Sequence, residues 1–286
     1  MALDLGKIGV WWSGSWHDAN DGDHNVAGDL ESLGYGTLWS SGGFEPGLAP
    51  RFGELLAGTR HCAVASGIAS IWTTTPSDAG PAVTELEDRY DGRFLFGIGA
   101  SHSLIVQDYV RPYSRMVEYL DGLDALERPI APERRILAAL GPRMLRLAKE
   151  RAAGAHPYFV PVEHTAYARE VLGTGPLLAT EVAVVLETDR TAALELARRY
   201  AGIYLPLPNY TNNLRRFGYT DDDLEGGGSD RLIEAVIPWG DADAIAARVR
   251  AHLEAGADHV CVQVVADFDK FPIAQYRALA PALIGS

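Results

Sequence analysis

The chain has 286 residues, a formal net charge of −13 at pH 7, 47% hydrophobic residues and 22% charged residues. This composition is typical of a globular protein with a substantial core, folded as one large α/β domain or two smaller ones. The negative charge argues against nucleic acid or an anionic membrane as a main partner. The sequence has no secretory leader pattern and no apolar run of about 18 residues, so we expect a cytoplasmic protein that binds no membrane.

Eight apolar runs predict β-strands along the chain. They cover residues 7–12, 36–41, 61–72, 93–99, 136–140, 156–160, 178–186 and 259–265. A short run that is apolar throughout, such as residues 136–140, suits a parallel strand that is covered on both faces.

Apolar residues at three- and four-residue spacing predict helices between these strands. The expected helices cover residues 25–33, 54–57, 81–90, 106–126, 142–153, 190–204, 243–254 and 275–284. Residues 206–228 interrupt the alternation with a proline- and asparagine-rich run and a glycine cluster. We expect an insertion there, with some helix and an exposed, flexible tip, inside a single domain of residues 1–286.

Residues 135–160 form the clearest strand–helix–strand unit. Pro142 opens its helix, because proline is favoured at the first helical position, and Gly154 ends it. The turn before the helix directs backbone N–H groups outward beside Arg143, an arrangement that can hold an anion. On this turn alone, an ordinary loop of an α/β protein is the simpler interpretation.

The two cysteines, Cys62 and Cys261, are far apart in the sequence. Both stand inside apolar runs. Their spacing matches neither a disulfide framework nor a metal-binding motif, so we expect two buried free thiols and no metal site.

Eight strands that alternate with helices match a single-domain (β/α)8 TIM barrel with an insertion after strand seven. A doubly wound sheet is the alternative, but no GxGxxG motif opens a helix here. In a barrel the functional site lies at the C-terminal ends of the strands. Trp11, Trp12, Trp39 and Trp72 stand there, and they predict either walls for a flat, ring-shaped ligand or packing at the barrel top.

Five segments carry a resemblance to a known family, in the family's order. They are ESLGYGTLW, SGIASIWTTTPSDAGPAV, DGRFLFGIGASHS, AALGPRMLRLAKERAAGAHPYFV and HLEAGADHVCVQ. The chain resembles the bacterial luciferase-like flavin and deazaflavin oxidoreductases. It is most similar to the actinobacterial branch that uses coenzyme F420, with F420-dependent glucose-6-phosphate dehydrogenase and methylenetetrahydromethanopterin reductase.

The resemblance implies a cofactor site at matching positions. In the family the third strand ends in a bulge, often with a non-proline cis peptide that backs the cofactor ring, and Gly67-Ile68 is the best match. The positions that match the ring-binding part are Gly67, Ile68, Ser70, Gly99, Ala100 and Ser101. The positions that match the phosphate-binding part are Gly141, Pro142, Arg143, Pro161, Val162 and Thr165.

The resemblance has one departure, at the end of strand two. Many relatives have an Asp-His pair there, near the substrate, where this chain has Ser41-Gly42-Gly43. The role of that carboxylate therefore cannot be transferred to Gly42, and sugar-phosphate and alcohol oxidation are in doubt. The resemblance still places Gly42 near the substrate, where the barrel rule also puts the four tryptophans as possible walls.

The implied reaction is hydride transfer between C5 of the deazaflavin and a small organic substrate. His102 is the first candidate for the accompanying proton transfer, because the usual pKa of histidine lies near 6.5. His17 is the second candidate and Glu187 the third. A hydrogen-bonded loop histidine is the alternative interpretation of His102.

Other functions fit the same sequence. An FMN-dependent monooxygenase would use residues 206–228 as a lid that shields the reaction from water. A non-catalytic flavin- or deazaflavin-binding protein is compatible with the missing carboxylate. A phosphosugar isomerase fits less well, because no convincing lysine or carboxylate pair stands at the strand ends. Since family members commonly dimerise, the resemblance also implies a homodimer.

Overall fold

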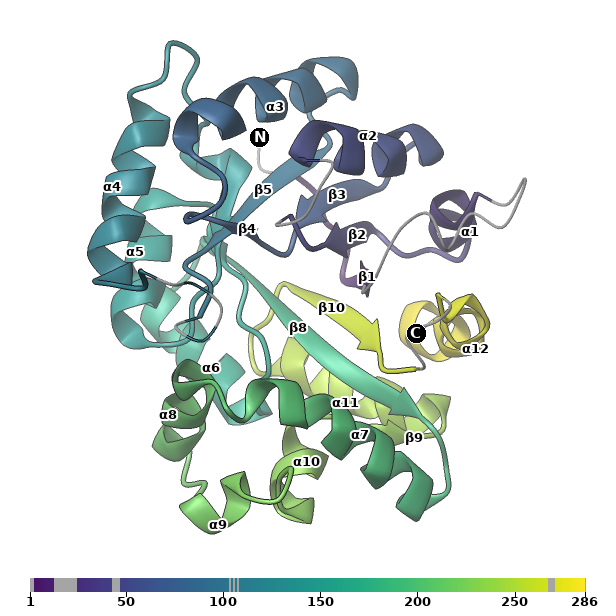
Figure 1. The fold of residues 1–286 in the computed structure, drawn as a ribbon. Coiled ribbons are helices and arrows are strands. Elements are labelled where there is room, and N and C mark those ends of the chain that lie inside the picture. The colour runs from purple at the N-terminus through teal and green to yellow at the C-terminus, as the bar shows by residue number, and fades with distance from the viewer. Residues whose placement is uncertain are drawn as a thin grey trace.

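The computed structural model of the chain describes residues 3–12, 25–42, 47–102, 104, 106, 108–266 and 271–285. Every strand pairing in it is parallel, and eight strands close into a barrel in the order β1-β2-β3-β5-β6-β7-β8-β10, with β10 paired to both β8 and β1 (Figure 1). The strands are β1 (Ile8–Trp12), β2 (Thr37–Ser40), β3 (Ala63–Ser66), β4 (Ala69–Ser70), β5 (Phe94–Gly99), β6 (Arg135–Leu137), β7 (Gly154–Ala155), β8 (Leu177–Leu186), β9 (Trp239–Gly240) and β10 (His259–Val264). The predicted (β/α)8 barrel is confirmed, and the open doubly wound sheet is excluded.

Helices surround the barrel (Figure 1). They are α1 (Val26–Ser32), α2 (Leu48–Gly58), α3 (Pro76–Arg89), α4 (Pro112–Asp124), α5 (Pro142–Arg151), α6 (Val162–Leu172), α7 (Arg190–Tyr204), α8 (Pro208–Arg216), α9 (Asp221–Leu224), α10 (Asp230–Val236), α11 (Ala242–Glu254) and α12 (Ile273–Ile284), with a 3-10 turn at Pro132–Arg134. Among the described residues, no helix combines the length and the apolar character needed to cross a bilayer.

The core has an inner and an outer part, because successive side chains of a strand point to opposite faces. Ala65 and Leu95 belong to the cluster inside the barrel, whereas Val64 and Phe94 pack toward the helices. Cys261 lies in the inner cluster. Both cysteines are buried and free, as the sequence predicts.

The third strand differs from the expected run over residues 61–72. It stops at Ser66, and the chain resumes as β4, which pairs with the C-terminal end of β5. The Gly67–Ile68 peptide bond between the two pieces is cis. The Ser66 hydroxyl donates to the Gly97 carbonyl oxygen at 2.9 Å and accepts from the Gly97 N–H at 2.7 Å. The break in the sheet therefore keeps its hydrogen bonds.

Two expected helices were placed with the wrong bounds. The helix expected over residues 106–126 begins only at Pro112, because Arg111 has a left-handed backbone with φ of 47° and proline favours the first helical position. The helix expected over residues 81–90 begins at Pro76, where the Thr75 side chain caps it. Pro81, the expected first residue of this helix, lies inside it.

The expected helix over residues 54–57 is also too short, since α2 spans Leu48–Gly58.

The sixth strand is shorter than expected and begins earlier. β7 covers Gly154–Ala155, not residues 156–160, and α5 ends at Arg151. The Pro157 carbonyl oxygen still accepts from the Glu181 N–H at 2.9 Å, but Pro157 has no N–H group to donate and Phe159 has a left-handed backbone, so strand pairing ends there.

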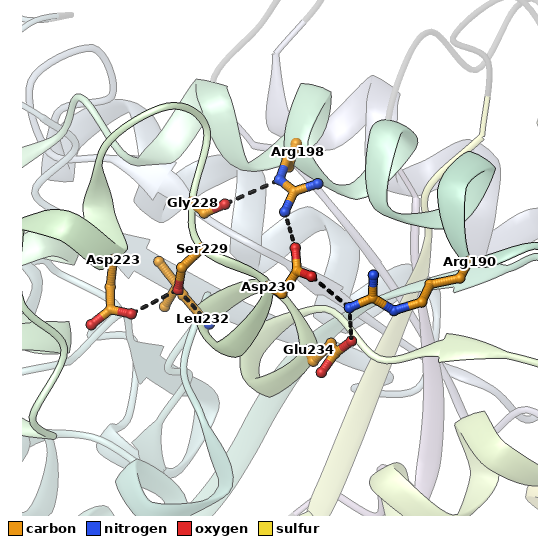
Figure 2. A network of polar contacts seen from close by, with 8 residues as sticks. All are labelled: Arg190, Arg198, Asp223, Gly228, Ser229, Asp230, Leu232 and Glu234. Atoms are coloured by element: carbon orange, nitrogen blue, oxygen red, sulfur yellow. Dashed lines mark hydrogen bonds and ion pairs between the residues drawn. The ribbon is translucent and has the colours of Figure 1, made fainter.

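Helices α8 to α10 form the insertion between α7 and β9, and ion pairs fasten its last helix to α7. Arg190 contacts Asp230 at 2.5 Å and Glu234 at 3.2 Å, and Arg198 also contacts Asp230 (Figure 2). Ser229 caps α10 through a bond from the helix backbone. These contacts attach the insertion to the barrel layer.

The insertion is only partly exposed. Glu225 and Gly226 form an exposed turn, as expected. Tyr210 and Leu214 of α8, by contrast, are buried in a cluster with residues of α7 and α10. This segment therefore has an apolar face of its own.

Gly97→Ala is expected to lower the free energy of unfolding by about 1–3 kcal/mol, because an added methyl group strains a packed interior. A Cβ at this position would lie 1.7 Å from the Ser66 carbonyl oxygen. Gly202→Ala is the control, since a Cβ there meets nothing within 4 Å and the site is on a helix. It should change stability by no more than about 1 kcal/mol, in the stabilising direction. Urea unfolding of both variants tests this, and equal midpoints would contradict it.

Candidate functional site

A cavity of about 340 Å³ opens at the C-terminal ends of the strands. Its walls come from the bulge after β3, the turn after β5, the segment from β6 to α5, the residues after β7, and helix α8. The residues named by the sequence that line it are Ile68, Gly99, Ala100, Ser101, His102 and Gly141. Segments far apart in the chain thus meet at the edge where the barrel rule places a site.

The floor of the cavity depends on close backbone contact. A Cβ at Gly99 would lie 2.5 Å from Cδ1 of Ile68 and 3.2 Å from Cβ of Ala138. Ser101 takes a left-handed backbone with φ of 57°, which turns the chain from β5 along the cavity wall. Glycine at position 99 therefore lets the bulge and the β6 segment approach each other.

Gly67 faces away from the cavity, toward the barrel interior. A Cβ there would lie 2.5 Å from Nε1 of Trp11 and 3.3 Å from Nε2 of His156. Ser70 accepts a hydrogen bond from the Trp72 N–H at 3.3 Å and does not line the cavity. Of the predicted bulge residues, only Ile68 reaches the cavity.

His102 has the partner that the sequence could not identify. Its Nδ1 lies 3.1 Å from Oδ1 of Asn209 on α8, and its ring is 5.3 Å from that of Tyr210. Burial lowers the pKa of His102 from 6.5, although the bond to Asn209 acts in the opposite direction. His102 is therefore neutral at pH 7, with Nδ1–H directed at the insertion. His17, the other predicted histidine, lies outside the described residues.

The cation at the cavity is not the one predicted. Arg143 is exposed, and its guanidinium lies over the Tyr113 ring at 4.1 Å. Arg216 of α8 lines the cavity instead, with Nη1 3.3 Å from where a Cβ of Gly141 would be. Sequence spacing suggested Arg143 because it follows the turn, whereas Arg216 approaches through the fold of the insertion.

The N-terminus of α5 is open to a ligand at this end of the cavity. Gly141 is its N-cap and offers no side chain to the first N–H groups, and Pro142 occupies the first turn without lining the cavity. Asn213 of α8 is 4% exposed and lines the same end. Its Oδ1 and Nδ2 have no hydrogen-bond partner within the described residues. Such a buried amide can bind a polar group of a ligand.

The second predicted phosphate-binding segment lies away from the cavity. Pro161 is the N-cap of α6 and Val162 its first residue. The Thr165 hydroxyl is fully buried and bonds Nδ1 of His252 at 2.8 Å, which joins α6 to α11. None of these three residues lines the cavity.

Two of the predicted tryptophan walls are core residues. Trp39 is fully buried inside the barrel, stacked on His156 at 4.3 Å, and donates to Nε2 of His259 at 3.1 Å. Trp12 points outward and stacks on Phe271 at 3.8 Å. Strand alternation directs neither of them to the cavity.

The remaining predicted substrate contacts support the cavity wall from behind. The Trp72 indole N–H donates to the Ala100 carbonyl oxygen at 2.6 Å. The Gly42 N–H donates to the Ile68 carbonyl oxygen at 3.1 Å. Neither residue lines the cavity, so both position the residues that do.

A buried polar cluster at the barrel top was missed by the sequence reasoning. His156 and Tyr158 line the cavity, Tyr158 bonds Tyr200, and Tyr200 bonds Gln263. Glu181 of β8 faces His156, and burial raises the pKa of its carboxyl well above 4.5. The available indication was a glutamate within the apolar run LATEVAVVL.

The chain matches one known protein family. A family model described as luciferase-like monooxygenase matches residues 24–259. No curated protein matches the chain in sequence.

Solved structures share the fold over nearly the whole chain. An F420-dependent secondary alcohol dehydrogenase in complex with an F420-acetone adduct has a TM-score of 0.70 at 14% identity, covering 97% of this chain and 98% of the other. The coenzyme F420-dependent tetrahydromethanopterin reductase from Methanopyrus kandleri has a TM-score of 0.71 at 16% identity, covering 96% and 97%. The oxygenating constituent of 3,6-diketocamphane monooxygenase from Pseudomonas putida, with FMN, has a TM-score of 0.67 at 16% identity, covering 96% and 95%.

Asn209→Ala is expected to lower the pKa of His102 further, because the Asn209 oxygen favours the protonated ring. The comparison is Asn212→Ala, on the same helix and also beside the cavity, which should leave that pKa unchanged. An NMR titration of the imidazole signals measures both. If His102 titrates alike in the two variants, the contact across the cavity is not made in solution.

Proposed function

The chain belongs to the luciferase-like monooxygenase family, and on this premise we propose that it is a coenzyme F420-dependent oxidoreductase acting on a small organic substrate. The observation that carries the proposal is one cavity with two unlike ends. One end has apolar walls and the other exposes a helix N-terminus, an unpaired amide and an arginine. A flat ring with an anionic tail has the same two parts.

The residues present fit such a cofactor. Ile68, Ala138, Ala139 and Met144 offer apolar contacts to a ring. The first turn of α5, with Asn213 and Arg216, would hold a phosphate through N–H groups and charge. These are the residues to which we assign cofactor binding, together with Gly99, Ala100, Ser101 and Gly141.

Charge near the N-terminus of α5 supports F420 in particular. Arg143 and Arg216 stand near the α5 N-terminus, and neither forms an ion pair with a described carboxylate. In a protein with a net charge of −13, two arginines at one place that pair with no described carboxylate favour an anionic partner. F420 is a polyanion through its phosphate and the carboxylates of its tail.

The bound deazaflavin would supply or accept the hydride at its C5 carbon. The chain would orient the ring over Ile68. The cavity tyrosines Tyr109, Tyr158 and Tyr210, together with α8, would exclude water from the ring. His102 would offer a neutral imidazole, with Nε2 free to accept a hydrogen bond from the substrate. In the same proposal, residues 206–228 act as a cover, since α8 contributes Asn209, Tyr210, Asn213 and Arg216 to the cavity wall.

An FMN-dependent monooxygenase is the second candidate. The fold shared with an FMN-bound oxygenase favours it, and so does the cover formed by α8, which would shield an oxygen-reactive intermediate. FMN carries the same combination of flat ring and phosphate. FMN lacks the polyanionic tail that the two arginines would bind.

Parallel fluorescence titrations with F420 and with FMN test the cofactor directly. We expect saturable binding of F420 in the micromolar range and weaker binding of FMN. Tighter binding of FMN would replace the proposal with the second candidate. Binding of neither would refute both.

Arg216→Ala is expected to weaken F420 binding by about 10- to 100-fold, because a hydrogen bond to a charged group contributes about 1.5–3 kcal/mol. Arg146→Ala is the matched control, since Arg146 is an exposed arginine on α5 that does not line the cavity. The same titration measures both variants. Equal affinities would place the phosphate elsewhere.

A further inference from the structure

A buried histidine supports the end of the cavity where α5 begins. His164 of α6 is fully buried and does not line the cavity. Its Nε2 lies 3.0 Å from the carbonyl oxygen of Leu140, a residue that does line it. Leu140 directly precedes Gly141, the N-cap of α5. His164 therefore contacts the backbone of the cavity wall from the side that is closed to solvent.

The hydrogen-bond partner of His164 defines the state of its ring. A carbonyl oxygen can only accept a hydrogen bond, so Nε2 carries the hydrogen and donates it to Leu140. Burial lowers the pKa of His164 to about 4, the bond to Leu140 acts in the opposite direction, and the positive charge of Arg216 lowers the pKa further. The ring is therefore neutral at pH 7 and offers one N–H donor without adding charge.

Neighbouring groups hold this ring in place. Its centroid lies 5.4 Å from that of Phe217, just after α8, and 6.2 Å from that of Tyr167, and both contacts are edge-on. The backbone N–H of His164 donates to the Pro161 carbonyl oxygen at 3.0 Å at the start of α6. The Leu140 carbonyl group thus points toward a donor that has little freedom to move.

The orientation of the Leu140 carbonyl group also sets the orientation of the next N–H group. The Leu140–Gly141 peptide bond is trans. In a planar trans peptide the C=O and N–H groups point in opposite directions. The Gly141 N–H therefore points away from His164. Gly141 lines the cavity, and no group within the described residues accepts a hydrogen bond from this N–H.

A positive charge stands beside Gly141. Apart from its chain neighbours, the three heavy atoms nearest to the position of a Cβ on Gly141 all belong to the Arg216 guanidinium, with Nη1 at 3.3 Å. The Gly141 N–H, the first N–H groups of α5 and this guanidinium are all donors. An anionic oxygen suits the space beside them.

We propose that His164 is a positioning residue, which holds the Gly141 N–H toward a phosphate oxygen of the ligand by fixing the Leu140 carbonyl group. The imidazole itself touches no ligand atom. The inference rests on the proposed function, because it takes the phosphate of the cofactor as the bound group. It adds a residue outside the cavity that strengthens binding of the phosphate and leaves binding of the ring unchanged.

The first experiment removes the donor with His164→Leu and titrates the variant with two ligands. One is F420, and the other is its riboside, which has the ring and the sugar chain but neither phosphate nor tail. Affinity for F420 should fall about 10-fold, the size of one hydrogen bond to a charged group, while affinity for the riboside stays the same. Equal losses for both ligands, or no loss for F420, would overturn the inference. FMN and riboflavin are the equivalent pair if FMN is the cofactor.

His164→Gln is the rescue variant, because a glutamine amide can place an N–H donor near the position of Nε2. It should recover most of the affinity for F420, and a variant as weak as His164→Leu would show that the N–H is not the acting group.

His252→Gln is the matched control. His252 is 2% exposed and bonds the Thr165 hydroxyl instead of the cavity wall. This variant should leave the ratio of the two affinities unchanged. A ratio altered as in His164→Leu would mean that general disturbance of the packing between α6 and α11 causes the effect.

The second experiment needs no cofactor and uses inorganic phosphate as the probe. In an amide NMR spectrum of the wild type, the Gly141 signal should shift saturably as phosphate is added, because its N–H binds the anion. In His164→Leu the same shift should need more phosphate. A Gly141 signal that ignores phosphate in the wild type, or an equal response in both proteins, would overturn the inference.

Failure of the two proposals can be told apart. A protein that binds neither F420 nor FMN refutes the proposed function, whereas the phosphate titration still decides whether His164 positions the Gly141 N–H. A protein that binds F420 and its riboside with the same affinity ratio in the wild type and in His164→Leu keeps the proposed function and loses this inference.

Discussion

The close contact between Ser66 and Gly97 is the constraint on which the cavity depends. Ser66 ends β3, and its hydroxyl takes over both hydrogen bonds of the Gly97 backbone. Only glycine permits this approach, since a Cβ would overlap the Ser66 carbonyl oxygen. The chain is then free to leave the sheet at Gly67 and return as β4, and this detour places Ile68 in the cavity floor.

The side chains inside the barrel change from apolar to polar along the barrel axis. Below, Ala65, Leu95 and Cys261 make an apolar filling around Trp39. Nearer the cavity, the side chains of His156 and Glu181 point into the barrel. A carboxyl group in such a place is costly to ionise, because closing the barrel removes its water. Burial therefore raises the pKa of the Glu181 carboxyl group, which faces a residue of the cavity wall.

Helix α8 gives the site its second half. Asn209 reaches the turn after β5 through His102, while Asn213 and Arg216 lie opposite the N-terminus of α5. The ion pairs at Asp230 hold α10 to α7 (Figure 2). The insertion is thus attached both to the turn after β5, through α8, and to α7, through α10. The cavity is consequently formed between the barrel edge and an added helix, not by the barrel alone.

The sequence by itself determined the barrel and predicted a site at the C-terminal strand ends, and the family resemblance pointed to Ile68, Gly99 and Gly141, which line the cavity there. The barrel follows from strand and helix periodicity, which is encoded by neighbouring residues. The sequence placed Trp39 and Arg143 at the site, whereas Trp39 is buried inside the barrel and the Arg143 guanidinium lies over Tyr113. Only the tertiary structure decided these, because the inward face of a strand and the approach of Arg216 from a distant helix both arise when eight strands close on one another.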